Sequence, residues 1–371
     1  MNRRQALIGG LAASALLGKG WLTGAGARTS CTDATKSLRS GERLDIVGNE
    51  FHAGGAPVRL LGVAVGDPIY VRAQRTLADY QVIAQAWNAN VVRISLHPGH
   101  WRADRDNALQ LLSREVDASR AAGLRVIIVW QAIGFPGHFF EHPEPEWGLP
   151  ADIYVSDASL AAQFWDAVAQ TFGRDPGILF ELWNEPVVDG QVYSSTGKDW
   201  PLLKPLWSRL LGTVRRHSDA IVLAAGGCWA HDLQGVTSDP LDDDRVAYAW
   251  HCYPPWDDGK PAGWLASLGG VPAEKPVVVT EWGFCRDCPR YIQGTAKSFG
   301  EPFVDQVLEP LRLNSTAWCW SPGAAPQMLQ SDGSTPTEFG AFVKRYLATT
   351  AWRPLKASLR TACQGEGGDV N

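Results

Sequence analysis

Charged residues are scarce in this 371-residue sequence, and the basic ones are scattered along it. Only 20% of the residues are charged, and 34 Lys and Arg against 39 Asp and Glu give a formal net charge of −5. Proteins that bind nucleic acid cluster their Lys and Arg on one face or stripe. The sequence lacks that footprint, so we expect no nucleic-acid partner.

Three patterns that would indicate other functions are also missing. No repeat or low-complexity linker is present, so we expect one large domain. No glycine-rich phosphate motif follows the first predicted strand. Four histidines lie in predicted loops without metal-ligand spacing such as His-Glu-x-x-His, so we expect no metal and no cofactor. These histidines are His97, His100, His138 and His231.

No apolar run near the N-terminus is long enough to span a bilayer comfortably. The apolar stretch 6–18 follows Arg3 and Arg4, and a small-x-small cleavage site lies at 25–27. This arrangement resembles a twin-arginine export signal, with an ordinary Sec signal as the alternative. We therefore expect residues 1–27 to be an export signal. The mature protein would be periplasmic or extracellular, without stable membrane insertion.

The seven cysteines make at least one disulfide plausible in an exported protein. Cys285-x-x-Cys288 has no second ligand pair and no thioredoxin-like context, so a loop-closing disulfide is the preferred interpretation over a zinc or redox site. Cys31 and Cys363 could join the two ends of the chain. The odd total leaves at least one thiol unpaired in a monomer, the state that we expect.

Strand-like runs recur along the chain after a polar segment at 28–43, which we expect to be loosely held. Residues 44–57 predict a β-hairpin with Gly48-Asn49 at its tip. Eight short apolar runs follow, as buried parallel strands would require. They are 59–65, 91–96, 124–130, 178–183, 220–225, 245–250, 276–281 and 315–320.

Amphipathic helical patterns separate most of these runs. Repeated strand–helix alternation predicts a parallel sheet, and eight strands in one domain favour a closed (β/α)₈ TIM barrel of class α/β, over residues 44–352, with the N-terminal β-hairpin before it. An open doubly wound sheet is the alternative. Residues 353–371 would be a C-terminal tail. The crossover after 220–225 lacks a helical pattern and should be mostly loop. The predicted helices are 76–87, 109–122, 159–172, 202–217, 302–313 and 338–349.

Two glutamates, Glu185 and Glu281, lie at the far ends of the runs 178–183 and 276–281. A parallel barrel places its chemistry where its strands end. Two carboxylates presented there can cleave a glycosidic bond, one as proton donor and the other as nucleophile. Their separation of 96 positions in the sequence is about what three barrel units span, so they would face each other across the mouth of the barrel.

The run around the first glutamate is specific enough to suggest a family. Phe180-Glu181-Leu182-Trp183-Asn184-Glu185-Pro186 resembles the fourth-strand signature of glycoside hydrolase family 5, the cellulase family. Five more segments resemble other parts of that family and occur in the right order. They are 92–94, 167–176, 250–253, 279–283 and 317–321.

The resemblance implies roles for the residues that end these strands. Glu185 would be the acid/base and Glu281 the nucleophile of a retaining mechanism. Arg93 and Tyr253 would keep Glu281 ionised, the first by its charge and the second by a hydrogen bond. The alternatives are that Arg93 pairs with a structural carboxylate and that Tyr253 is an ordinary strand-end residue. Glu181 is expected to be a buried structural partner.

Three further residues would contact the sugar or the acid/base. Asn184 is expected to hydrogen-bond the sugar 2-hydroxyl. His251 would lie on the acid/base side, with an ordinary strand-end role as its alternative. Trp320 would form the floor under the sugar at the cleavage point.

The chain departs from the family at the end of its third strand. The family usually has a His there, whereas this sequence has Gln131. Glutamine can still hydrogen-bond a hydroxyl, but it cannot carry charge. The two carboxylates are unaffected by this change, but the choice of substrate by analogy is weakened.

Tryptophan is unusually abundant, with 17 residues. Many stand at predicted strand ends, where their flat faces suit stacking against sugar rings; filling the core is the alternative. They include Trp130, Trp183, Trp250, Trp282 and Trp320.

These observations favour a secreted retaining β-glycoside hydrolase whose partner is a carbohydrate. An endo-β-1,4-glucanase acting on a β-glucan is our first hypothesis. A β-mannanase, an exo-acting β-glucosidase and a transglycosylase are the alternatives within the same chemistry. A non-catalytic carbohydrate-binding protein on the same fold is the alternative from another class.

Overall fold

The computed structural model describes residues 41–69, 75–139, 141, 149–188 and 197–350. The predicted export signal at 1–27, the tail at 353–371 and the proposed pairing of Cys31 with Cys363 lie outside these residues. The same holds for all but the last three residues of the segment 28–43.

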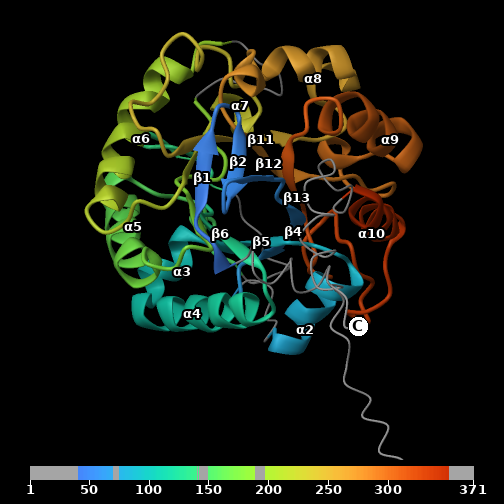
Figure 1. Ribbon diagram of the computed structural model, residues 1–371, viewed down its shortest axis with the longest axis horizontal. Helices are drawn as coiled ribbons and strands as arrows, with labels where there is room; N and C mark the ends of the chain where they lie inside the picture. Colours follow the sequence, from blue (N-terminus) through green and yellow to red (C-terminus); the bar gives the residue numbers. More distant parts are fainter. Residues whose placement is uncertain (1–40, 70–74, 140, 142–148, 189–196, 351–371) are drawn as a thin grey trace, which may run out of the picture.

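Eight parallel strands close into a barrel that a ring of helices surrounds (Figure 1). Each strand pairs with the next along the chain, and the last pairs with the first. The predicted TIM barrel is therefore confirmed, and the open doubly wound sheet is wrong. The strands are β4 (Leu61–Gly66), β5 (Val91–Leu96), β6 (Arg125–Trp130), β9 (Ile178–Glu181), β10 (Val222–Ala225), β11 (Val246–Cys252), β12 (Val277–Trp282) and β13 (Asn314–Ala317).

Alternation along the strands divides their side chains between two buried layers, because successive residues of a strand point to opposite faces. One layer fills the inside of the barrel, and the other packs under the helices. Val91, Ile127 and Leu179 belong to the inner cluster, whereas Val92 and Val126 belong to the outer one. A residue two positions after an inward-facing residue of a strand therefore also faces the interior, and it lies nearer the carboxyl end of that strand.

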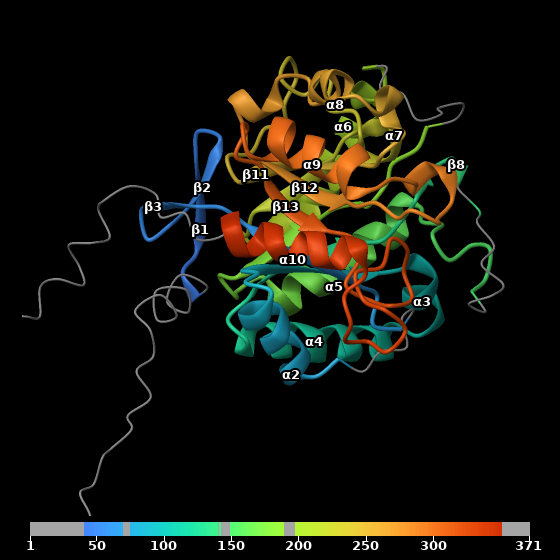
Figure 2. The ribbon, with the colours of Figure 1, turned by 90° about the vertical axis from the view of Figure 1, so that its right-hand side faces the viewer.

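A small antiparallel sheet covers the other end of the barrel (Figure 2). The predicted hairpin is confirmed, and the structure adds a third strand to it. Leu44, Phe51 and Ala53 pack into the inner cluster and close the barrel at this end. The strands are β1 (Leu44–Val47), β2 (Glu50–Ala53) and β3 (Ala56–Val58).

The helices lie outside the barrel, and all six predicted ones are present with shifted ends. The predicted helix 302–313 begins earlier, at Ala296, and ends at Leu308, because three short helices run on from one another there. The main helices are α2 (Leu77–Gln81) with η1 (Val82–Ala86), α3 (Pro98–Ala103), α4 (Arg105–Ala121), α5 (Ala158–Phe172), α6 (Trp200–Arg215), α8 (Pro261–Ser267), η6 (Ala296–Gly300) with α9 (Glu301–Phe303) and η7 (Val304–Leu308), and α10 (Glu338–Thr350).

Short elements occur in the loops. The crossover between β10 and β11 is mostly loop, as expected, and its one-turn α7 contains Cys228 and Trp229 in the left-handed region. The sequence analysis missed α8, which follows the Trp- and Pro-rich loop after β11. The remaining elements are β7 (Gly134–Phe135), β8 (His138–Phe139), α7 (Gly227–Ala230), η3 (Trp256–Gly259), η4 (Val271–Ala273) and η5 (Arg290–Ile292).

The predicted disulfide between Cys285 and Cys288 is confirmed, in the loop that follows β12. Within the described residues, Cys252 and Cys319 are buried free thiols. Within the described ranges, no helix combines the length and the apolar character that crossing a bilayer requires.

Candidate active site

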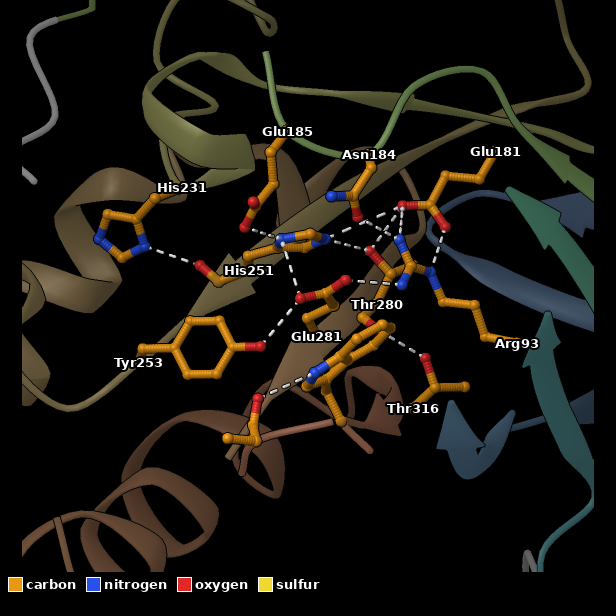
Figure 3. A network of polar contacts seen from close by, with 12 residues as sticks. Arg93, Glu181, Asn184, Glu185, His231, His251, Tyr253, Thr280, Glu281 and Thr316 are labelled. Carbon is orange, nitrogen blue, oxygen red and sulfur yellow. Dashed lines mark hydrogen bonds and ion pairs between the residues drawn. The ribbon is translucent and has the colours of Figure 1, made fainter. Parts of the chain in front are cut away.

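Arg93 lies inside the barrel at the centre of a polar network (Figure 3). It comes two residues after the inward-facing Val91 on β5, and Glu181 comes two after Leu179 on β9. The guanidinium donates from Nε to Glu181 Oε2 over 2.6 Å and from Nη2 to Glu181 Oε1 over 3.1 Å. This forked contact between fully buried groups gives Glu181 the structural role that the sequence analysis expected.

The same guanidinium also reaches the two strand ends that carry the site. Its Nη1 donates to Glu281 Oε1 over 2.8 Å, and its Nη2 donates to Asn184 Oδ1 over 2.7 Å. Burial opposes the charge on Arg93, but Glu181 and Glu281 outweigh it and raise the pKa of Arg93 above its usual value. Burial would likewise raise the pKa of Glu181, yet the charge of Arg93 lowers it on balance. Both groups are therefore ionised.

Glu281 receives a hydrogen bond on each carboxylate oxygen. Arg93 donates to Oε1, and the Tyr253 hydroxyl donates to Oε2 over 2.8 Å. Burial and then the charge of Glu281 raise the pKa of Tyr253 well above its usual value, so this hydroxyl keeps its proton. The two donors fix the orientation of Glu281.

Glu185 has a different environment from Glu281. Its backbone is held against the end of β6, because its N–H donates to Ala132 O and its carbonyl accepts from Gly134 N. Its Oε1 lies 3.0 Å from His251 Nδ1, and one of its oxygens lies within 4.8 Å of an oxygen of Glu281. Burial raises the pKa of Glu185; the hydrogen bond with His251 opposes this, and the charge of Glu281 adds to it. Glu185 is thus the carboxyl group of this pair that holds a proton more readily.

His251 joins Glu185 to a second row of buried groups. Its Nε2 lies 3.0 Å from Thr280 Oγ1, and Thr280 Oγ1 lies 2.9 Å from Glu181 Oε1. Burial alone would lower the pKa of His251, but the carboxylates of Glu281, Glu181 and Glu185 raise it to about 9. This second row of contacts was not foreseen from the sequence, although Thr280 stands next to Glu281 in the chain.

His231 supports the backbone of His251 from the other side (Figure 3). Its Nδ1 lies 2.8 Å from the carbonyl oxygen of His251, and its Nε2 lies 2.7 Å from Asp257 Oδ2. The ring is buried against Trp250 and Trp256. His231 therefore belongs to the structural support of the site.

Gln131 follows β6 and is buried, with its backbone N–H bonded to Leu96 O. Its Oε1 is buried without a hydrogen-bond partner among the described residues. An unmatched buried acceptor is unfavourable unless a ligand supplies a donor. This state suits the expected contact with a sugar hydroxyl, which stays a prediction.

Two tryptophans after β13 differ in their surroundings. Trp320, the expected floor of the site, is buried edge-to-face against Trp87, with ring centroids 4.5 Å apart. Trp318 is half-buried, and its ring centroid lies 5.9 Å from Arg93 Cζ. The geometry therefore favours Trp318 over Trp320 as the ring beside the carboxylates. Ala317 packs in the outer layer, so Trp318 starts towards the interior, but strand alternation alone would give Trp320 the same direction.

The prediction that strand-end tryptophans stack on sugars is wrong for four of them. Trp130, Trp183, Trp250 and Trp282 are at most 1% exposed. They occupy outward-facing positions and pack under the helices; Trp130, for example, stacks on Phe164 of α5. Filling the space between the strands and the helices is their role.

Asp67, which directly follows β4, forms a second polar cluster with His97 and His100. Asp67 Oδ2 lies 2.7 Å from His97 Nδ1 and 2.9 Å from His100 Nδ1, and it also accepts from His97 N. The three side chains have ligand atoms close enough to hold a metal ion, as do Glu185, His251 and Glu281. Ligand atoms around a tetrahedral zinc would be about 3.3 Å apart, given bonds of about 2.0–2.1 Å. Asp67 Oδ2 lies closer than this to both histidine nitrogens, at the distances of hydrogen bonds.

The chain matches the family described as Cellulase (glycosyl hydrolase family 5) over residues 51–323, which is more than half of its length. The chain belongs to this family, so it is a glycoside hydrolase that acts on glycosidic bonds. The suspected resemblance is thereby confirmed. The matched residues include the whole barrel and every side chain of the polar network around Arg93.

The curated relatives are similar to this chain at low identity. The cellulase CelDZ1 of Thermoanaerobacterium sp. is 24% identical over 286 residues, which are 71% of this chain and 68% of the relative. The endoglucanase MaCel5A of Microbulbifer sp. is 23% identical over 263 residues, which are 65% of this chain. The match spans less than half of the Microbulbifer enzyme, 44% of its length.

Solved structures share the fold. A β-glucanase of Saccharophagus degradans, SdGluc5_26A, crystallised in complex with cellotetraose, has a TM-score of 0.74 and is 24% identical; the match covers 85% of this chain and 96% of that one. The catalytic domain of Thermobifida fusca endoglucanase Cel5A has a TM-score of 0.66 and is 18% identical, with 84% and 99% covered. At these identities the likeness shows the barrel architecture alone.

Asp67 generates a prediction about acid stability. Burial would raise the pKa of Asp67, but the hydrogen bonds from His100 and His97 hold it well below its usual range. Its charged form therefore stabilises the fold above the unfolded pKa of about 3.9, and this contribution is lost as the pH falls below that value. We expect the free energy of unfolding of Asp67→Asn to depend less steeply on pH than that of the wild type below about pH 4.

Urea unfolding of both proteins at pH 7 and at several acid pH values measures this difference. Asparagine keeps the shape of the side chain and an acceptor oxygen but cannot titrate, so it isolates the charge. Parallel pH dependences of the two proteins would show that Asp67 does not titrate below its unfolded pKa in the native state.

Proposed function

We propose that this chain is a retaining β-glycoside hydrolase that cleaves a β-linked glucan by double displacement, with endo-β-1,4-glucanase activity as the first hypothesis. The observation that carries the proposal is the distance of at most 4.8 Å between one oxygen of Glu185 and one of Glu281. Carboxyl groups about 5–5.5 Å apart are typical of retaining enzymes, and inverting enzymes need about 6.5–9.5 Å. Stereochemistry tests this point directly. The first product seen by proton NMR should be the β-anomer, and initial release of the α-anomer would contradict retention.

In the first step Glu281 attacks the anomeric carbon, and the bond from that carbon to the leaving oxygen breaks. Arg93 and Tyr253 hold one oxygen each of Glu281, so its charge is available in a fixed direction. Glu185 gives its proton to the leaving oxygen. Its raised pKa supports this role, because a general acid must hold its proton until the leaving group departs.

In the second step a water molecule displaces Glu281 from the sugar, and Glu185 accepts the proton of that water. Glu281 carries no charge while it is esterified. Glu185 then loses the neighbouring negative charge that helps to raise its pKa, so it can act as a base. The same residue therefore serves as acid and then as base.

Asn184 and a tryptophan would position the sugar. Because Asn184 Oδ1 accepts from Arg93, its amide nitrogen is left to donate towards the 2-hydroxyl, a contact that strengthens in the transition state. Trp318 would provide the flat surface beside the cleaved sugar, in place of Trp320.

The family and the names of the relatives support a β-glucan as substrate. Similar proteins are named cellulase and endoglucanase, and a structural neighbour binds cellotetraose. A β-mannanase, an exo-acting β-glucosidase and a transglycosylase use the same carboxylates and are the alternatives. We also propose that residues 1–27 direct export, which the paired arginines and the following apolar stretch support.

A substrate panel tests the choice of β-glucan. Cellulose derivatives, mixed-linkage β-glucan, mannan, xylan and cello-oligosaccharides are incubated with the enzyme, and the products are separated by chromatography. An endo-β-1,4-glucanase should release a range of cello-oligosaccharides from soluble cellulose early in the reaction. Release of glucose alone would indicate exo action, and activity on mannan alone would overturn the β-glucan assignment.

Glu281→Gln is predicted to abolish turnover, because a neutral amide cannot attack the anomeric carbon. Folding should persist, since glutamine keeps the shape of the side chain and its acceptor oxygen. Hydrolysis of an activated aryl glycoside and thermal unfolding are measured together. Normal hydrolysis by the folded variant would show that Glu281 is not the nucleophile.

Glu185→Ala is predicted to slow poor leaving groups far more than activated ones. A general acid contributes about 10²–10⁴-fold where the leaving oxygen needs a proton, and little where it does not. Rates of the first step for a cello-oligosaccharide and a dinitrophenyl glycoside are compared with wild-type rates. An equal loss for both substrates would contradict the acid role.

A further inference from the structure

The hydroxyl of Thr280 lies between Glu181 and His251, and Glu181 determines the direction of the hydroxyl hydrogen. Thr280 Oγ1 is 2.9 Å from Glu181 Oε1 and 3.0 Å from His251 Nε2 (Figure 3). A hydroxyl has one hydrogen to donate. Glu181 is a carboxylate held by two donors of Arg93, so its oxygens can only accept. The Thr280 hydrogen therefore points to Glu181.

This arrangement leaves only a lone pair of Thr280 Oγ1 for His251. His251 Nε2 must then carry a hydrogen in order to donate to it. The reverse arrangement would place two acceptor oxygens, Thr280 Oγ1 and Glu181 Oε1, face to face at 2.9 Å. All three side chains are fully buried, so bulk water is not available to separate them.

With a hydrogen fixed on Nε2, the charge of the ring determines whether Nδ1 accepts or donates a hydrogen bond. His251 Nδ1 faces Glu185 Oε1 at 3.0 Å. If the ring is neutral, Nδ1 accepts and Glu185 must hold the proton; if the ring is charged, Nδ1 donates to the Glu185 carboxylate. In both states one proton lies between Nδ1 and Glu185. A neutral ring with its only hydrogen on Nδ1 would also place a proton there, but passing it to Glu185 would leave an imidazolate anion, so Glu185 would have no proton to give.

We propose that Thr280 is a positioning residue that keeps a hydrogen on His251 Nε2 and thereby keeps the proton of the general acid between His251 and Glu185. The role of Glu185 in this statement rests on the proposed function. Thr280 also has a fixed backbone, because the Thr316 hydroxyl of the next strand donates to Thr280 O over 2.8 Å.

Thr280 is the hydrogen-bond partner of His251 Nε2 within the described part of the chain. Glu181 Oε1 lies 3.9 Å from Nε2, beyond hydrogen-bonding distance. Glu281 Oε2 lies 3.8 Å from Nδ1 and so reinforces a proton on that side. The titratable groups that face the ring or its backbone are Glu181, Glu185, Glu281 and His231. Arg93 and Tyr253 lie behind Glu281, and Asp257 lies behind His231.

The test substitutes Thr280→Val, which keeps the branched shape and removes the hydroxyl. Without an acceptor on Nε2, the ring releases that hydrogen more readily, and the neutral ring moves its hydrogen to Nδ1. The basic limb of kcat/KM against pH for a cello-oligosaccharide should therefore move to lower pH by about one unit or more. Thr280→Ser should restore the wild-type profile, because it restores the hydroxyl.

Thr316→Val is the matched control. It removes a buried hydroxyl one strand away that contacts the Thr280 backbone and not His251. Its basic limb should stay where the wild-type limb is. An unshifted limb in Thr280→Val, or an equal shift in both valine variants, would overturn the proposal.

Nitrogen-15 NMR of histidine-labelled protein tests the tautomer without using activity. The signal of His251 is assigned by its absence in His251→Asn. The wild type should carry a hydrogen on Nε2 throughout the neutral range, and Thr280→Val should shift towards Nδ1. A wild-type ring protonated on Nδ1 alone would overturn the proposal even if Thr280→Val failed to fold. Failure of the proposed function, seen as activity in Glu281→Gln, would leave this measurement unaffected.

Discussion

The site depends on one buried positive charge, the guanidinium of Arg93. A fully buried ion is unfavourable unless its charge is compensated and its hydrogens are bonded. Arg93 meets both conditions by donating to Glu181, Glu281 and Asn184, which come from the ends of two strands on different sides of the barrel. The closed barrel is what allows these strand ends to meet around one side chain. Loss of Arg93 would leave two buried carboxylates without a counter-charge.

The same charge explains why the two glutamates at the barrel mouth behave differently. Arg93 hydrogen-bonds Glu181 and Glu281, and its charge lowers the pKa of Glu181. Glu185 receives no hydrogen bond from Arg93; its side-chain partner in the described structure is His251. Burial and the negative charge of Glu281 then raise its pKa. The position of Arg93 thus separates Glu181, whose pKa is lowered, from Glu185, whose pKa is raised.

The sequence predicted the parts of this site that local pattern determines. Buried strands appear as short apolar runs, so all eight were found, and the polar residues that end them include Arg93, Glu185 and Glu281. The missed parts depend on the direction of side chains. Trp318 and Trp320 belong to one run, and only their packing separates the residue beside Arg93 from the one against Trp87. The Asp67 cluster was missed because its three members come from two different strand ends.

Gln131 shows which properties of the site follow from membership of the family and which do not. The charge balance of the site involves Arg93, His251 and the three glutamates, so a neutral amide in place of the family's usual histidine does not disturb it. What changes is the bonding offered to the sugar, because the buried Oε1 of Gln131 lacks a donor and would favour a hydroxyl there. The proposed catalytic groups and the proposed contacts to the substrate are therefore separable in this barrel. Membership of the family accordingly fixes the type of reaction more firmly than the sugar or the linkage.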